Sequence, residues 1–215
     1  MPILSLNEIK VNNKHIALRV DFNVPIENGK VKDDFRLKSC LPTIKKIIRE
    51  GGRVSILSHL GRPQEGHRTQ DHSLKILAPV LSKMLGLEVI FVEHWIDGFA
   101  NNKVSLLENV RFLPGESDND ETLGKKMATL FDIFVNDAFA TAHREQASTC
   151  GIAKHIPVCC AGPLFIHEID SLNQVLKSPM HPIIAIVGGS KVSTKIGVLK
   201  NLSEKVDFLI VGGGI

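Results

Sequence analysis

The segment from Arg19 to Arg36 reads Arg-Val-Asp-Phe-Asn-Val-Pro-Ile-Glu-Asn-Gly-Lys-Val-Lys-Asp-Asp-Phe-Arg. Its beginning belongs to an apolar, β-prone run from Ile16 to Phe22, which predicts a strand. Pro25 and the pair Asn28-Gly29 predict a loop after this strand. A strand that ends in polar side chains and leads into a helix commonly forms part of a site in α/β proteins.

Arg36 is expected in the first turn of the helix that follows, with Asp33 or Asp34 as the N-cap. A cation at this end of a helix is disfavoured by the helix dipole. An anion bound beside Arg36 would remove the conflict. The alternative is a solvent-exposed arginine next to two aspartates, and the local sequence leaves both interpretations open.

The totals indicate a chain with a sizeable core and no strong charge. With 215 residues, of which 43% are hydrophobic, the chain can form one large domain, or one domain and part of another. The net charge of +3 is mild, and no block of basic residues occurs, so nucleic-acid binding is not expected. The nine histidines show no zinc-binding spacing, and no metal site is expected.

Cysteine usage and the absence of targeting signals predict a cytoplasmic protein. The four cysteines, Cys40, Cys150, Cys159 and Cys160, contain no C-x-x-C pair, so free thiols in a reducing compartment are the simplest interpretation. No signal peptide opens the chain, and no apolar run is long enough to span a bilayer.

Short apolar strands alternate with amphipathic helices along most of the chain, which predicts an α/β fold. After the first strand, strands are expected at Arg53–Leu57, Val89–Val92, Val104–Leu107 and Ile133–Val135, with helices around 37–50, 73–85 and 123–130. Pro42 lies in the first helical pattern and is expected to kink that helix or delay its start. The alternation predicts a doubly wound, Rossmann-like parallel sheet covered on both faces.

The rhythm changes at Gly162-Pro163, where a long amphipathic helix is expected, ending near Pro179. A strand at Ile183–Val187, a helix around 196–202 and a strand at Phe208–Val211 follow. Two strands and one helix cannot bury a core of their own. We therefore expect an N-terminal lobe at 1–161, an interlobe helix at 162–179, and the incomplete start of a second α/β lobe at 180–215.

Basic residues recur where predicted strands end. Because the carboxyl ends of parallel strands lie at one edge of the sheet, these residues are expected to gather there. Arginine forks match phosphate and carboxylate oxygens in pairs, so five cationic side chains at one edge predict a pocket for a small polyanion. Asp21 and Asn23 would bond to hydroxyls and hold the arginines in place. Each basic residue alone could equally be an ordinary loop or surface residue. The five are Arg36, His59, Arg62, Arg111 and Arg144.

A second candidate site is Gly188-Gly189-Ser190-Lys191 together with Lys195. Two glycines between a strand and a helix start can cradle a phosphate with free backbone N–H groups. The segment is neither a Walker A loop nor a Rossmann G-x-G-x-x-G loop, and a tight turn with solvated lysines fits equally well. No nucleophile elbow or defensible carboxylate pair occurs, so positioned cations favour phosphoryl transfer over hydrolysis.

Taken together, the motifs closely resemble the phosphoglycerate kinase family. Any one could arise by chance, but they occur in family order along the whole chain. The matching segments are Arg19–Pro25, Ser58–Pro63, Leu107–Phe112, Asn136–Phe139, Thr141–Arg144, Gly188–Lys195 and Val211–Gly214.

The resemblance implies a two-lobed glycolytic kinase that transfers a phosphoryl group reversibly between 1,3-bisphosphoglycerate and MgADP, giving 3-phosphoglycerate and MgATP. It implies that the substrate residues are Asp21, Asn23, Arg36, His59, Arg62, Arg111 and Arg144. It also implies that Gly188, Gly189, Lys191 and Lys195 bind nucleotide, and that Arg36, Lys191 and Lys195 are catalytic. Mg²⁺ would arrive with ATP or ADP, and a monomer without nucleic-acid or membrane partners is expected.

Two departures from the family pattern stand out. Glu145 and Gln146 follow Arg144, where the family often has Ala-His, so a second histidine has no counterpart and a negative charge adjoins the basic residues. The family's chains are also nearly twice as long, and the missing half holds the adenine pocket and the acidic residues that handle Mg-nucleotide. A non-catalytic module that only binds phosphoglycerate is therefore the alternative. A nucleotide-dependent oxidoreductase is disfavoured, because no G-x-G-x-x-G follows the first strand.

Overall fold

A computed structural model describes residues 3–100, 102–177, 180–189 and 196–213 of the chain. The chain divides into a larger compact unit, Met1–Ile166, and a smaller one, His167–Ile215. The boundary falls within a single helix, α5 (Pro163–Lys177). The division at 1–161, 162–179 and 180–215 stays a prediction.

A parallel sheet of six strands, in the order β5-β6-β4-β1-β7-β8, forms the centre of the larger unit. Its central strand β1 pairs with β4 and β7, so that Leu18 lies between Ile56 and Val135. The strands are β1 (His15–Arg19), β4 (Arg53–Leu57), β5 (Ile90–Val92), β6 (Val104–Leu107), β7 (Ile133–Asn136) and β8 (Val158–Ala161).

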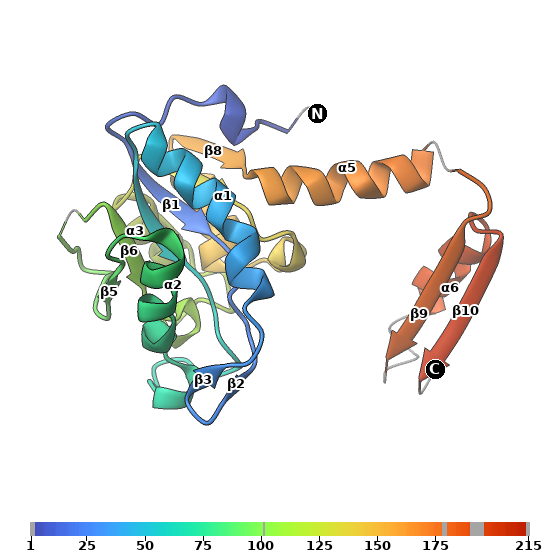
Figure 1. Ribbon diagram of the computed structural model, residues 1–215, viewed down its shortest axis with the longest axis horizontal. Helices are drawn as coiled ribbons and strands as arrows, with labels where there is room; N and C mark the ends of the chain where they lie inside the picture. Colours follow the sequence, from blue (N-terminus) through green and yellow to red (C-terminus); the bar gives the residue numbers. More distant parts are fainter. Residues whose placement is uncertain (1–2, 101, 178–179, 190–195, 214–215) are drawn as a thin grey trace. The chain divides into compact units, whose positions relative to one another are not determined.

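Helices cover both faces of this sheet, as the alternation of buried side chains requires. Ile16 and Leu18 of β1 pack in one apolar cluster with residues of α1 (Phe35–Arg49) and α2 (Leu77–Leu85). Ala17 packs in the opposite cluster with residues of α3 (Glu121–Ala128) and α4 (Ile152–His155). Figure 1 shows α1 and α2 in front of the strands. The predicted doubly wound α/β fold is confirmed.

Local signals explain where most elements begin and end. Asp34 occupies the N-cap position of α1, while the Asp33 carboxylate accepts the Phe35 N–H at 2.8 Å. Helix α2 ends at Gly86, whose φ of 70° is left-handed. Short turns of 3-10 helix lie at Leu6–Glu8, Gln70–His72, Leu74–Ile76, Val110–Phe112 and Phe139–Thr141, and a π turn lies at Ala147–Gly151.

Several details differ from the sequence prediction. Strand β1 ends at Arg19, before the predicted end at Phe22, because the chain turns into the polar loop there. Pro42 does not delay helix α1, which begins seven residues before it at Phe35. Strand β8 was not predicted, although it pairs with β7. The loop after β1 also contains a small hairpin, β2 (Ile26–Glu27) and β3 (Lys30–Val31), around the positive-φ pair Asn28-Gly29.

The smaller unit has two parallel strands, β9 (Ile184–Gly189) and β10 (Phe208–Gly213), joined by α6 (Ile196–Ser203). These elements confirm the predicted strand–helix–strand order. Its strands expose large apolar side chains, with Ile186 75% and Phe208 59% exposed. Such exposure fits two strands and a helix that lack the further layers of an α/β lobe.

Candidate functional site

Four neighbouring strands, β6, β4, β1 and β7, end at the same edge of the sheet. The segments that follow them carry Arg111, His59 with Arg62, Asp21 with Asn23, and Arg144, respectively. Strands β1 and β7 are adjacent, but their onward connections run in opposite directions, which is the switch point where open α/β sheets bind ligands.

Each of the four arginines predicted at this edge lies within electrostatic reach of His59 or of Arg111. Burial and then the charges of Arg19, Arg111, Arg144 and Arg36 lower the pKa of His59 to about 2. Burial, Arg144 and Arg62 likewise lower the pKa of Arg111. The structure therefore brings the predicted set together. We call it the basic rim, and it consists of Arg36, His59, Arg62, Arg111 and Arg144.

One property of the basic rim was predicted wrongly. His59 was expected to be a cation, but it is only 3% exposed and surrounded by arginines, so it is neutral near pH 7. Desolvation and like charges both disfavour the imidazolium form. The basic rim therefore consists of four cations and one neutral imidazole.

Asp21 resolves the conflict between Arg36 and the helix dipole. The Arg36 guanidinium donates a hydrogen bond to Asp21 Oδ2 and forms an ion pair with it. The other carboxylate oxygen of Asp21 accepts the backbone N–H of Asn23 at 3.1 Å. Asp21 thus supplies the negative charge beside Arg36 and holds this arginine in place.

Gly61 connects the strand-end loops to one another. Its N–H donates to Asn23 Oδ1 at 2.8 Å, and its carbonyl accepts a hydrogen bond from the Arg111 guanidinium. Its φ is +63°, and an added Cβ would lie 2.1 Å from Cδ2 of His72. Only glycine fits this position without strain, so Gly61 fixes the loop that carries Arg62 against Asn23 and Arg111.

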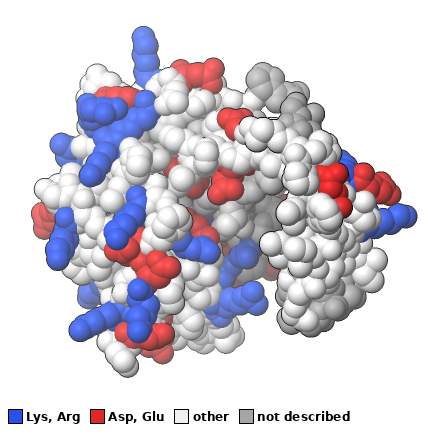
Figure 2. Space-filling model, turned by 45° about the vertical axis from the view of Figure 1, so that its right-hand side comes forward, with Lys and Arg blue, Asp and Glu red and all other residues white. Residues whose placement is uncertain are grey.

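Two arginines of the basic rim remain available for a ligand. Within the described part of the chain, neither Arg62 nor Arg144 donates a side-chain hydrogen bond or forms an ion pair. Arg62 is exposed and Arg144 is half-buried. Figure 2 shows one face of the molecule, on which basic and acidic side chains are interspersed. The basic rim differs from such a surface because its unpaired cations gather at one sheet edge.

A buried polar network behind the basic rim was missed in the sequence analysis. Arg19 is 1% exposed, and its Nε donates to Ser148 Oγ at 3.2 Å. Ser148 in turn donates through Oγ and N to the Glu116 carboxylate, at 2.6 and 2.9 Å. Burial lowers the pKa of Arg19 to about 10, so it remains charged at neutral pH. The sequence signal for this network was the position of Arg19 at the end of an apolar strand. An arginine in such a strand is buried, and a buried arginine needs hydrogen-bond partners.

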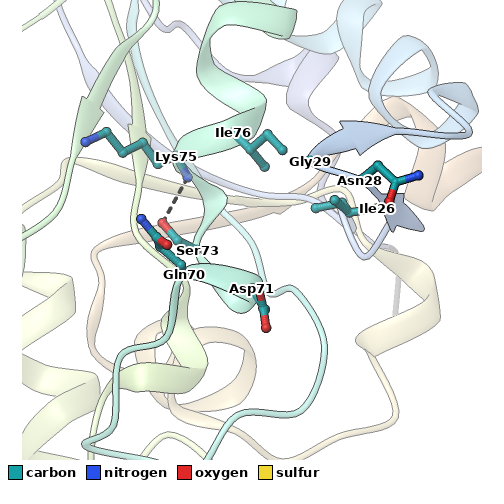
Figure 3. A pocket seen from close by; sticks show the side chains of 8 residues that line it. All are labelled: Ile26, Asn28, Gly29, Gln70, Asp71, Ser73, Lys75 and Ile76. Atoms are coloured by element: carbon teal, nitrogen blue, oxygen red, sulfur yellow. Dashed lines mark hydrogen bonds between the residues drawn. The ribbon is translucent and has the colours of Figure 1, made fainter.

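The cavity drawn in Figure 3 lies away from the basic rim. It has a volume of about 640 Å³ and is lined by Ile26, Asn28, Gly29, Gln70, Asp71, Ser73, Lys75 and Ile76. The Lys75 and Asn28 side chains extend to opposite sides of it (Figure 3). The residues that line this cavity include one cation, Lys75, against four at the basic rim, so the basic rim is the better candidate site for an anion.

The predicted nucleotide site is only partly described. Gly188 and Gly189 end strand β9, whereas Lys191 and Lys195 lie outside the described residues. No group of three or more His, Cys, Asp or Glu side chains within the described ranges is arranged to hold a metal ion. No helix among these residues is long and apolar enough to cross a membrane.

Comparison with known proteins places this geometry in a family. A profile described as phosphoglycerate kinase matches residues 6–215. The chain belongs to the phosphoglycerate kinase family. The resemblance seen in the sequence motifs is thereby confirmed.

Relatives in this family are 34–51% identical to the chain over the residues that align with it. Phosphoglycerate kinase of Francisella tularensis subsp. novicida (strain U112) is 50% identical over 217 residues, which cover 100% of this chain and 55% of that protein. The solved structure of phosphoglycerate kinase from Coxiella burnetii is 51% identical, with a TM-score of 0.89 over 99% of this chain and 55% of that one. The Pyrococcus horikoshii OT3 structure is 34% identical, with a TM-score of 0.86 over 98% of this chain and 55% of that one. The chain thus spans about half the length of these relatives.

Proposed function

We propose that this chain provides the phosphoglycerate-binding part of a phosphoglycerate kinase that acts in glycolysis. The reaction is the reversible transfer of a phosphoryl group between 1,3-bisphosphoglycerate and ADP, giving 3-phosphoglycerate and ATP. One observation carries the proposal: Arg62 and Arg144 lie unpaired, within the described residues, beside two further arginines at the switch point of the sheet. Nothing in the comparisons favours the non-catalytic alternative.

The substrate phosphate and carboxylate would lie along the basic rim. Arg62 and Arg144 supply unpaired forks, which match phosphate oxygens in pairs. Asp21 and Asn23 orient Arg36 and Gly61, and Asn23 keeps its NH₂ group for a substrate hydroxyl. The proposed substrate residues are Asp21, Asn23, Arg36, His59, Arg62, Arg111 and Arg144.

Phosphoryl transfer suits such a site because it needs alignment and charge neutralisation more than a protein nucleophile. Arg36, Lys191 and Lys195 are proposed to stabilise the charge on the transferred group. Gly188, Gly189, Lys191 and Lys195 are proposed to contact the nucleotide. Mg²⁺ is proposed to arrive with ADP or ATP. The described residues offer no acidic cluster to hold it, so no step is assigned to it in this chain.

Replacing Arg36 in the full-length protein tests the catalytic part of the proposal. Arg36→Ala should lower turnover roughly 10²–10³-fold, because it removes a preorganised cation. Lys38→Ala is the matched control, since Lys38 is an exposed cation on the same helix and forms an ion pair with Asp34. The control should turn over like the wild type in a coupled assay. An Arg36→Ala enzyme with near-normal turnover would refute the role.

A further inference from the structure

The contact between Arg19 and His59 determines which nitrogen of the imidazole carries the proton. The Arg19 NH2 nitrogen lies 3.4 Å from His59 Nδ1 in a buried hydrogen bond. A guanidinium group has only donors, so His59 Nδ1 must be the acceptor. In a neutral imidazole the other nitrogen then carries the proton. The geometry therefore requires the Nε2–H tautomer of His59.

The protonated nitrogen is free to meet a ligand. Nε2 of His59 has no hydrogen-bond partner among the described residues. Arg53 Nε and Asn119 Oδ1 are the only fully buried, unpartnered side-chain atoms in the described part of the chain, so Nε2 keeps contact with solvent. His59 thus turns its acceptor nitrogen inward to Arg19 and keeps its donor for a ligand.

Arg19 can act in this way because it is itself held on the opposite side. Its Nε donates to Ser148 Oγ at 3.2 Å, and its NH1 donates to the Val20 carbonyl at 2.5 Å. Ser148 is fixed by Glu116, which accepts hydrogen bonds from both its hydroxyl and its N–H. Each of the three guanidinium nitrogens of Arg19 thus donates to its own acceptor, and together these bonds fix the orientation of the group.

We propose that Arg19 is a positioning residue that fixes His59 as the neutral Nε2–H tautomer, so that His59 offers an anionic ligand a hydrogen-bond donor and not a positive charge. The functional half of this inference rests on the proposed binding of phosphoglycerate. A neutral donor gives the site a directional hydrogen bond without adding a fifth cation beside Arg36, Arg62, Arg111 and Arg144.

Nitrogen NMR of the unliganded chain tests the tautomer without any assumption about function. Long-range ¹H–¹⁵N spectra separate protonated from bare ring nitrogens, and the His59 signals are assigned by their loss in His59→Gln. The expected result is a protonated Nε2 and a bare Nδ1 from about pH 8 to pH 5.5, because the groups that face His59 — Arg19, Arg36, Arg111 and Arg144 — are all cationic. A protonated Nδ1, or an imidazolium that forms in this range, would overturn the proposal.

A variant of Arg19 tests whether this residue sets the tautomer of His59. In Arg19→Met the donor to Nδ1 is gone, so we expect Nδ1 protonation or an ordinary titration of His59 to appear. An unchanged tautomer in a folded Arg19→Met protein would refute the positioning role. If this variant does not fold, Arg19→Gln takes its place, because an amide can turn either its oxygen or its NH₂ group toward Nδ1. That variant should leave His59 with a mixture of tautomers, and a pure Nε2–H form would count against the proposal.

Calorimetry with 3-phosphoglycerate tests what the tautomer does. His59→Ala should weaken binding roughly tenfold to a hundredfold, and His59→Gln, whose amide places an uncharged N–H near the position of Nε2, should recover most of that loss. Equal losses in both variants would mean that a charge is needed and would overturn the inference. If the wild type does not bind 3-phosphoglycerate while the NMR result stands, only the proposed function and the functional half that rests on it fail.

Discussion

At the scale of single residues, the site depends on side chains whose two polar atoms serve different partners. Asn23 accepts a hydrogen bond from Gly61 with its oxygen, and no described residue bonds to its NH₂ group. Asp21 bonds to Arg36 with one oxygen and to the Asn23 N–H with the other. Asp21 and Asn23 are thus both proposed to bind substrate, and each also holds a neighbouring residue in place. A substitution here should therefore affect stability and binding together.

Gly61→Ala should destabilise the larger unit more than an ordinary glycine substitution. Both Gly61 and Gly66 have positive φ, but a Cβ at Gly61 would meet His72 at 2.1 Å, whereas nothing lies within 4 Å at Gly66. Gly66→Ala should cost about 1 kcal/mol from backbone strain alone. Gly61→Ala should cost roughly 1–3 kcal/mol more, because the His72 ring must shift.

Urea unfolding followed by tryptophan fluorescence measures this difference. Trp95 is the single tryptophan and is buried in the larger unit, so its signal reports on that unit. Equal losses of stability in the two variants would show that the His72 ring moves away without cost. The close approach of His72 would then not be a reason for glycine at position 61.

The buried histidines should make stability fall in mild acid. Unfolded His59 takes up a proton near its ordinary pKa of 6.5, whereas its folded pKa is about 2. Between these values the unfolded state binds more protons, so stability should fall as pH drops below 6.5, by up to about 1.4 kcal/mol per pH unit. Burial also lowers the pKa of His15, which acts in the same direction. Glu116 and Asp137 have raised pKa values and oppose the trend nearer their own range.

The measurement is the unfolding free energy at several pH values between about 7.5 and 5.5, again read from Trp95. The His59→Gln variant is the control, because it removes one of the two histidines. Its slope should be shallower than that of the wild type. An equally steep slope would assign the pH dependence to other groups.

At the scale of elements, Asp137 fastens the start of α5 to the sheet and to α1. Its carboxylate accepts hydrogen bonds from Thr43 Oγ1 at 2.6 Å and from the Phe165 N–H at 3.1 Å. The carboxylate therefore caps the N-terminus of α5 from a distant part of the chain. Gly162 leaves the necessary room, because a Cβ there would lie 2.2 Å from Asp137 Oδ1.

Asp137→Ala should destabilise the larger unit by about 2–4 kcal/mol, because it leaves two donors without their acceptor. Thr43→Val should cost only about 1 kcal/mol, since Asp137 keeps its bond to α5. Denaturant unfolding of both variants, read from Trp95, compares the two losses. If Asp137→Ala stayed within about 0.5 kcal/mol of the wild type, the capping role would be wrong.

The sequence predicted the elements whose patterns are strong and local. Arg53–Leu57 and Val104–Leu107 are short apolar runs with clear ends, and both were predicted at their observed bounds. Val158–Ala161 escaped prediction because its two central residues, both cysteines, give no alternating pattern, and pairing with β7 makes it a strand. The gathering of the basic rim was predictable, because parallel strands share a carboxyl edge. The charge of His59 was not, since burial and neighbouring arginines set it.

At the scale of the whole molecule, the two units differ in how completely they are built. The larger unit buries two apolar clusters, one on each face of a six-stranded sheet. The smaller unit has two strands, and Ile186 and Phe208 are largely exposed. The basic rim lies wholly within the larger unit. Binding of phosphoglycerate should therefore be a property that this chain can show without the remaining half of its relatives' length.

Calorimetric titration of this chain with 3-phosphoglycerate is the most direct test of the basic rim. The wild type should bind one equivalent, with an affinity that falls as salt is added. Arg62→Ala with Arg144→Ala should weaken binding roughly a hundredfold or more, because both unpaired cations are lost. Lys45→Ala with Arg49→Ala, on the far half of α1, removes the same charge and should leave the affinity nearly unchanged. Unchanged affinity in the Arg62 and Arg144 double variant, or equal losses in both, would contradict the assignment.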